Sequence, residues 1–118
     1  MLLLFMCMNI SKEDLLRINK GFGGNLRNDA SLDFALEAIR NPKLGTYKRL
    51  AYLLRAILVD HPFSDGNKRK AMFVCLHFSE ENKKNVDRDL LLEQIVSIAK
   101  NNIQEIRNIE WRIKNCIR

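Results

Sequence analysis

The sequence predicts an all-α fold, a compact bundle of about six helices, because apolar residues recur at spacings of three and four along most of the chain. Five Gly and two Pro among 118 residues leave few points where the chain must turn, so long helices are expected. The alternation typical of strands is weak throughout. Hydrophobic residues make up 47% of the chain and charged residues 29%, a balance that favours a globular domain over a disordered chain.

The first two helices are expected in the N-terminal third of the chain. Ser11 and Asp14 have the spacing of a capping box, in which Ser11 begins a short helix that ends near Lys20. Apolar residues on one face predict a second helix over Ser31–Arg40. Asn41-Pro42 ends this helix, because the residue before a proline disfavours the helical conformation.

The next two helices flank a short polar segment. A third helix is expected from about Tyr47 to Asp60, with Thr46 available as its cap. Its broad apolar face indicates burial and consists of Leu50, Leu53, Leu54, Ile57 and Leu58. His61–Gly66 interrupts the periodicity, and a fourth helix is expected to begin near Asn67. This fourth helix is expected to be the buried central helix of the bundle.

Two more helices are expected in the C-terminal third. Asp87 or Asp89 can cap a fifth helix, whose apolar residues run from Leu91 to Ala99 and which Asn101-Asn102 ends. The last helix carries one stripe of isoleucines, which indicates a face in the core rather than a groove for a partner. These isoleucines are Ile103, Ile106, Ile109, Ile113 and Ile117.

The chain is basic, with 20 Lys and Arg against 14 Asp and Glu and a net charge of +6. A basic surface favours anionic partners such as nucleic acid, nucleotide phosphates or an acidic protein. The excess is spread evenly, since residues 1–60 carry nine basic and six acidic side chains and residues 61–118 carry eleven and eight. We therefore interpret most of these charges as a solvated surface.

Three cysteines, Cys7, Cys75 and Cys116, have no metal-site spacing and are expected to be free thiols in a reducing compartment. Met1–Met8 is apolar, but it is too short to span a bilayer and lacks the features of a signal peptide. It is interpreted either as a buried terminal segment or as an upstream start before a true start at Met8. We therefore expect a cytoplasmic protein with no membrane partner.

The residues that could take part in catalysis or bind a ligand concentrate in one segment at the start of the fourth helix. The N-terminus of a helix offers backbone N–H groups and a positive dipole end, and Gly66 allows close backbone approach to an anion. Lys68 and Arg69 add positive charge where it is unfavourable for the helix alone, which suggests that an anion belongs there. Asp65 could hold Mg²⁺ against phosphate oxygens, and His61 could accept a proton from a hydroxyl.

The segment His61-Pro62-Phe63-Ser64-Asp65-Gly66-Asn67-Lys68-Arg69 resembles the signature of the Fic/Doc family, H-P-F-x-[D/E]-G-N-[G/K]-R. The resemblance extends over residues 9–118 as a single domain, with 1–8 as a separate apolar segment. Members of the family transfer part of a nucleoside triphosphate, such as ATP, to a protein hydroxyl. The resemblance implies the following roles: catalytic base for His61, loop anchor for Phe63, Mg²⁺ ligand for Asp65, and phosphate contacts for Gly66, Asn67, Lys68 and Arg69.

Two departures from the signature of the AMP-transferring Fic enzymes resemble the Doc toxins. Lys68 stands where Fic enzymes usually have Gly, and Met72 stands where they usually have a second Arg. Pro62 and Gly66, in contrast, are Fic-like. Because Lys68 and Met72 change which phosphates can be held, the resemblance favours transfer of the γ-phosphate to a Ser or Thr hydroxyl, as Doc does on a translation elongation factor. AMP transfer is the alternative.

The resemblance also bears on regulation and partners. Many Fic proteins carry an inhibitory helix with the pattern [S/T]-x-x-x-E-[G/N], and no Ser or Thr of this chain is followed by Glu at that spacing. We therefore expect an inhibiting antitoxin partner in trans. A non-catalytic binding module with a basic surface is the rival hypothesis. No recognisable nucleic-acid motif supports it, so nucleic acid is not expected as a direct ligand.

The roles of several residues outside the motif are also predicted. The connector Lys43, Leu44, Gly45 and Thr46 is either a docking flap for the target, by analogy with Fic folds, or a plain link between helices. Lys70 is expected to be solvated, and His77 is expected at the surface or satisfied in the interior. Trp111 is expected to pack, with partner contact as the alternative.

Overall fold

The computed structural model describes residues 11, 13–14, 17, 29–60 and 66–118. Its labelled helices are α3 (Asp29–Ala38), α4 (Thr46–Leu58), α5 (Asn67–Glu81), α6 (Arg88–Lys100) and α7 (Ile106–Lys114). Within the described residues there is no strand, only an isolated antiparallel bridge between Val86 and Ile117. The predicted all-α fold is therefore confirmed, with five labelled helices where about six were expected.

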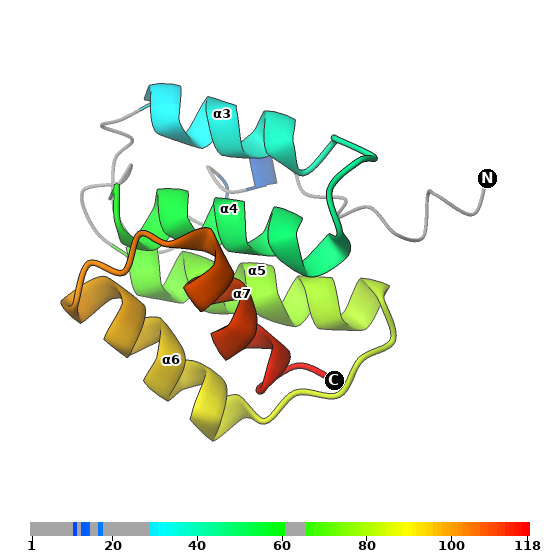
Figure 1. The fold of residues 1–118 in the computed structure, drawn as a ribbon, viewed down its shortest axis with the longest axis vertical. Coiled ribbons are helices and arrows are strands. Elements are labelled where there is room, and N and C mark those ends of the chain that lie inside the picture. The colour runs from blue at the N-terminus through cyan, green and yellow to red at the C-terminus, as the bar shows by residue number, and fades with distance from the viewer. Residues whose placement is uncertain (1–10, 12, 15–16, 18–28, 61–65) are drawn as a thin grey trace.

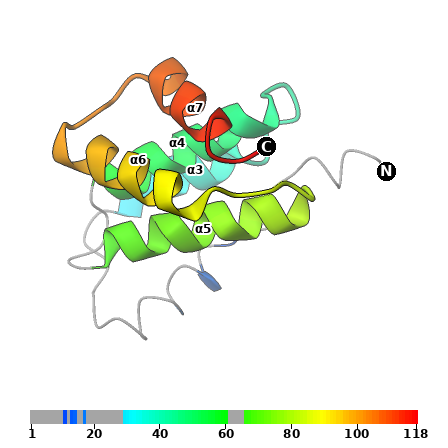
Figure 2. The ribbon, with the colours of Figure 1, turned by 90° about the horizontal axis from the view of Figure 1, so that it is seen from below.

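Helix α4 contacts α3, α5, α6 and α7 (Figure 1). Figure 1 shows α3 on one side of α4 and α6 and α7 on the other, and the view turned by 90° shows α5 below α4 and α7 above it (Figure 2). Helix α5 packs on both α4 and α6, and its inner face is buried. The helix before the motif and the helix after it thus share the centre of the bundle.

The core explains why these two helices are held firmly. The five apolar positions predicted for α4 are fully buried: Leu50, Leu53, Leu54, Ile57 and Leu58. Burial of each such side chain contributes about 1.5–3 kcal/mol relative to exposure. Since α4 runs to Leu58 and α5 starts at Asn67, the two buried helices fix both ends of the segment that carries the motif.

Two of the three N-caps that the sequence predicts are present at the starts of their helices. Ser11 N donates to Asp14 Oδ2 at 3.0 Å, and Asp14 N donates to Ser11 Oγ at 3.2 Å, so the predicted capping box is confirmed. Asp87 caps α6 by accepting a 3.1 Å hydrogen bond from Leu90 N. The prediction that Thr46 caps α4 is wrong, because Gly45 occupies the N-cap position and Thr46 is the first residue of the helix.

The last helix is shorter than the isoleucine spacing predicts. It begins at Ile106 rather than near Ile103, because Glu105 is extended, with φ −73° and ψ 120°, and occupies the N-cap position. At its other end, Asp87 N donates to Cys116 O at 2.8 Å, and the chain leaves the helix to pair with the segment before α6. The inward stripe is nevertheless confirmed, since Ile109, Ile113 and Ile117 are fully buried and Ile103 and Ile106 are partly buried against the core.

The remaining global expectations concern membranes and thiols. None of the helices among the described residues is long and apolar enough to cross a membrane. Cys75 and Cys116 are free thiols, as expected, and both are buried, while Cys7 lies outside the described residues. Burial raises the pKa of the Cys75 thiol far above its ordinary value, which keeps this group protonated and unreactive.

Candidate functional site

The described part of the motif forms the first turn of α5. Gly66 is the N-cap of that helix, and Asn67, Lys68 and Arg69 are its first three residues. The structure therefore brings together the four residues expected to contact phosphate. The expected base His61, the expected anchor Phe63 and the expected Mg²⁺ ligand Asp65 lie outside the described residues.

Gly66 has φ 74° and ψ 15°, which is the left-handed conformation. A side chain at this position would be strained, because L-residues rarely adopt this region. A left-handed residue followed by right-handed ones turns successive backbone N–H groups toward a common point, an arrangement that binds anions. The glycine is thus required by the backbone that the helix start adopts.

The electrostatics of this helix end favour an anion. The helical hydrogen-bond ladder begins with Lys70 N donating to Gly66 O at 3.0 Å, so the amides of residues 67–69 precede it and point toward the helix end. No acidic residue stands in the first turn, whereas Lys68 and Arg69 are exposed there. The dipole and both cations therefore contribute positive potential at one place.

Lys70 does not lie at the surface with them. Its side chain is fully buried, so the expectation of a solvated lysine is wrong. The reason is its place on the helix, since Lys70 is spaced by four and eight residues from the buried Val74 and Phe78. This spacing was visible in the sequence and is the signal that would have placed Lys70 inside.

The chemistry of the described site fits phosphate rather than a metal ion. Backbone amides and two cations cannot ligate Mg²⁺, which takes oxygen ligands. Among the described residues, no group of three or more His, Cys, Asp or Glu could hold a metal ion. The expectation of Mg²⁺ rests on Asp65 and stays a prediction.

Of the expected docking flap, Lys43, Leu44 and Gly45 lie between α3 and α4, and Thr46 is the first residue of α4. Hydrogen bonds hold this connector against α4. Arg49, itself almost completely buried, donates from Nε to Leu44 O at 2.9 Å. Lys43 N donates to Asn41 Oδ1 at 2.9 Å. These bonds explain the connector as a braced link, and its role as a docking flap stays a prediction. Arg49 was missed from the sequence, although it is four residues from the buried Leu53.

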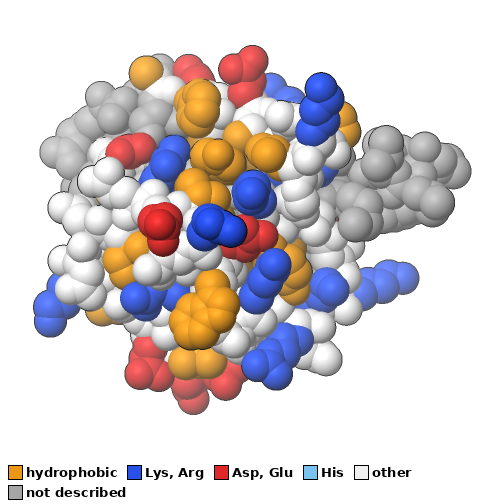
Figure 3. All heavy atoms as spheres, viewed as in Figure 1, with side chains coloured by type: hydrophobic (Ala, Val, Ile, Leu, Met, Phe, Trp, Pro, Cys, Tyr) orange, Lys and Arg blue, Asp and Glu red, His pale blue; other side chains and the backbone are white. Residues whose placement is uncertain are grey.

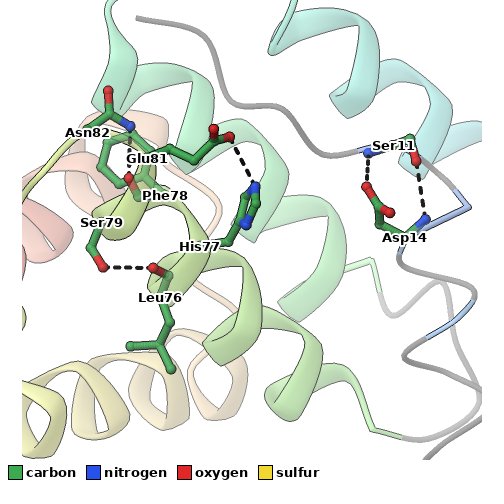
Figure 4. A network of polar contacts seen from close by, with 8 residues as sticks. All are labelled: Ser11, Asp14, Leu76, His77, Phe78, Ser79, Glu81 and Asn82. Carbon is green, nitrogen blue, oxygen red and sulfur yellow. Dashed lines mark hydrogen bonds and ion pairs between the residues drawn. The ribbon is translucent and has the colours of Figure 1, made fainter. Parts of the chain in front are cut away.

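His77 is half-buried on α5, beside Glu81. The Glu81 Oε1 atom lies 3.0 Å from His77 Nε2, and Figure 4 shows the two side chains approaching each other. This contact is close enough for an ion pair, but no described residue forms a hydrogen bond with Nε2. His77 also lowers the pKa of Asp14, although hydrogen bonding from Ser11 is the larger cause. The expectation of a surface or satisfied histidine is therefore not met, because the half-buried His77 keeps a buried Nε2 without a hydrogen bond among the described residues.

The comparisons with known proteins address the family. No curated protein and no solved structure matches the chain. A family model described as Fic/DOC family matches residues 9–79, more than half of the chain. The matched stretch includes α3, α4, the motif and most of α5, whereas α6 and α7 lie beyond it. On this match, the chain belongs to the Fic/DOC family.

Proposed function

We propose that the protein is a Doc-like phosphotransferase that moves the γ-phosphate of ATP, or of another nucleoside triphosphate, to a Ser or Thr hydroxyl of a protein. Members of the Fic/DOC family are typically transferases that use nucleotides. One observation carries the proposal for this chain. Gly66 adopts the left-handed conformation at the start of α5, beside the exposed Lys68 and Arg69, and this arrangement suits a phosphate group.

The choice of the γ-phosphate over AMP rests on two side chains of α5. Lys68 is exposed at the second position of the helix, where its ammonium can reach a phosphate oxygen beyond the helix end. Met72 is partly buried against the core, so this position supplies packing and no second guanidinium for a triphosphate. Both features support a Doc-like mode of nucleotide binding.

The chemistry proposed for the site is a simple displacement. The target hydroxyl oxygen forms a bond to the γ-phosphorus, and the bond between that phosphorus and the bridging oxygen of the leaving nucleoside diphosphate breaks. His61 would take the hydroxyl proton. The helix start and the cations near it stabilise the developing phosphate charge. Mg²⁺, with Asp65 as its ligand, would neutralise further phosphate charge when bound.

Label transfer separates the two reactions. The protein is incubated with Mg²⁺, a purified translation elongation factor and ATP labelled at either the α- or the γ-phosphate, and a cell lysate replaces the factor in parallel. Label on protein from the γ position only, lost in His61→Ala, is the expected result. Label from the α position would show AMP transfer and contradict the argument from Lys68. No label dependent on His61 from either nucleotide would contradict the enzyme proposal as a whole.

Inhibition in trans is part of the same proposal. Because the chain lacks the inhibitory pattern of many Fic proteins, we expect an antitoxin to restrain it. Expression of the chain alone should slow the growth of the host, and His61→Ala should relieve this effect. A catalytically active chain that is harmless when expressed alone would contradict the need for an antitoxin.

A further inference from the structure

We propose that the outer surface of α7 and α6 binds an acidic protein segment with apolar anchor side chains. This surface lies beyond the residues matched by the family model, and the inference does not depend on the proposed reaction. We call it the α6–α7 surface. Its members are Leu92, Val96, Ser97, Arg107, Trp111 and Arg112.

The first observation is the exposure of large apolar side chains. The Trp111 side chain is 68% exposed, so the expectation that it packs is wrong. It is two residues from both Ile109 and Ile113, which face the core, and this offset places it on the opposite side of the helix. Leu92 and Val96 on α6 are 50% and 39% exposed. Exposed tryptophan beside aliphatic side chains is typical of protein-binding surfaces.

The second observation is a guanidinium fixed by neutral groups. Arg112 donates from Nε to Asn108 Oδ1 at 2.7 Å, and from Nη1 to Gln94 Oε1 at 2.6 Å and to Ser97 Oγ at 3.2 Å. These three bonds hold the group in place without neutralising its charge, and none of them uses Nη2. The orientation of Arg112 is therefore set before any partner arrives, which lowers the entropic cost of binding.

The third observation is the charge around Trp111. A hollow of about 440 Å³ is lined by Glu105, Arg107, Asn108, Trp111 and Arg112. In the described part of the chain, neither Arg107 nor Arg112 forms an ion pair with a carboxylate, whereas Lys114 pairs with Glu110 at 3.4 Å. Two cations and one carboxylate thus line the hollow, and carboxylates of a partner complement it.

The neighbouring hollow on α6 decides the class of partner. It has a volume of about 590 Å³ and is lined by Asp89, Leu92, Glu93, Val96, Ser97, Lys100 and Asn101. Arg112 lines the first hollow and donates a hydrogen bond to Ser97, which lines the second, so the two hollows are neighbours. Asp89 and Glu93 would repel a nucleic-acid backbone that continued across α6, whereas Leu92 and Val96 match aliphatic side chains. Figure 3 shows an apolar cluster on this face, with basic side chains beside it and acidic ones at its edge.

The occupant that fits is therefore a protein segment with two parts. Its carboxylates meet Arg107 and Arg112, and an apolar side chain packs on the indole of Trp111. Its following aliphatic side chains cover Leu92 and Val96. Single-stranded nucleic acid could also stack on Trp111 and place phosphates near the two arginines, but Asp89 and Glu93 would repel its next phosphates and Leu92 and Val96 would stay uncovered.

A peptide titration tests the inference. The probe is a short fluorescein-labelled peptide rich in Glu and Leu, its control is the same peptide with Gln for every Glu, and binding is followed by anisotropy. Because Trp111 is the only tryptophan of the chain, its emission reports occupancy independently. We expect the Glu peptide to bind and to shift the Trp111 emission to the blue, and the Gln peptide to bind about tenfold more weakly.

Variants locate the site. Arg112→Gln is expected to weaken binding about tenfold, and the exposed Arg107→Gln, which leaves the α6–α7 hydrogen bonds intact, about threefold. Arg40→Gln removes the same charge from an exposed position outside this surface and should change the affinity by less than about twofold. Equal affinity in Arg107→Gln and wild type would overturn the inference. So would no blue shift with the Glu peptide, or tighter binding of a single-stranded oligonucleotide.

Discussion

The hydroxyl of Tyr47 donates a 2.7 Å hydrogen bond to the carbonyl oxygen of Ile117, and this contact joins the first turn of α4 to the end of the chain. The Tyr47 ring also packs on Phe78, with ring centroids 5.4 Å apart. Burial raises the pKa of Tyr47, so its hydroxyl stays protonated and can donate throughout the physiological pH range. The central helix is thereby braced by a residue distant in sequence.

Removal of that hydroxyl should loosen the C-terminal end. Tyr47→Phe is expected to lower the free energy of unfolding by about 1 kcal/mol, because the Ile117 carbonyl loses its donor while the ring packing is kept. Urea denaturation measures the change. Tyr52→Phe is the matched control, since its ring contacts Phe34 and Arg55 and no hydrogen bond of its hydroxyl is found among the described residues. An equal loss in both variants would show that the Tyr47–Ile117 bond contributes nothing specific.

The need for the left-handed backbone at Gly66 can be tested by comparing its alanine variant with that of a second glycine. Gly66→Ala is expected to destabilise the protein by about 1–2 kcal/mol, because alanine is strained at φ 74°. The same change should weaken ATP binding, since the amides at the start of α5 would be reoriented. Thermal unfolding and a binding titration measure the two effects.

Gly45→Ala provides the control for this substitution. Gly45 has φ −64°, and a Cβ added there would meet nothing within 4 Å. Its replacement should be neutral or stabilise by up to about 1 kcal/mol, because alanine restricts the unfolded chain. If Gly66→Ala left both stability and ATP affinity at the level of Gly45→Ala, the anion-binding role of this backbone would be refuted.

The capping box at Ser11 should make stability depend on pH at the acid end. The pKa of Asp14 is lowered below its ordinary value of 3.8, chiefly by the hydrogen bond from Ser11 N, so the folded state favours the carboxylate. The resulting stabilisation is fully present above pH 3.8 and is lost as the pH falls through the lower folded pKa. Asp14→Asn keeps an acceptor oxygen but removes the negative charge near the helix start, and it should cost about 0.3–1 kcal/mol at pH 7. This difference from wild type should shrink below about pH 4, as measured by chemical denaturation across pH. A constant difference between pH 7 and pH 3 would exclude the carboxylate as its source.

The helices that sequence spacing located best are those with one clear apolar face. The five predicted core positions of α4 are all buried, because three- and four-residue spacing places them on one side of a helix that other helices surround. Asp87 caps α6 as its position predicted. The start of α7 was misplaced because the isoleucine spacing continues back to Ile103, whereas the extended backbone of Glu105 sets the start of the helix. The spacing of apolar residues therefore predicts which residues face the core, whereas local backbone geometry determines where a helix begins and ends.

Charged side chains in the core were the main error of the sequence interpretation. Arg49 and Lys70 were not expected inside, since charged residues are rarely buried without partners. Their spacing from buried apolar residues predicts the outcome better than their charge does. At the candidate site, the sequence supplied the residue types at the start of α5. The left-handed conformation of Gly66 came from the structure, since several turn geometries allow glycine.

Two lysines within one turn of α5 are expected to have different roles: the buried Lys70 in the core, and the exposed Lys68 at the phosphate site. Lys70 is fully buried and is not an isolated charge, so Lys70→Met should cost about 1–3 kcal/mol by leaving its partner unsatisfied. Lys68 is exposed, so Lys68→Met should change stability by less than about 0.5 kcal/mol while weakening ATP binding. Urea denaturation and an ATP titration on both variants measure whether stability and ATP affinity change separately. A more stable Lys70→Met protein would show that the desolvation cost of the buried ammonium outweighs its contacts, and unchanged ATP affinity in Lys68→Met would remove Lys68 from the phosphate site.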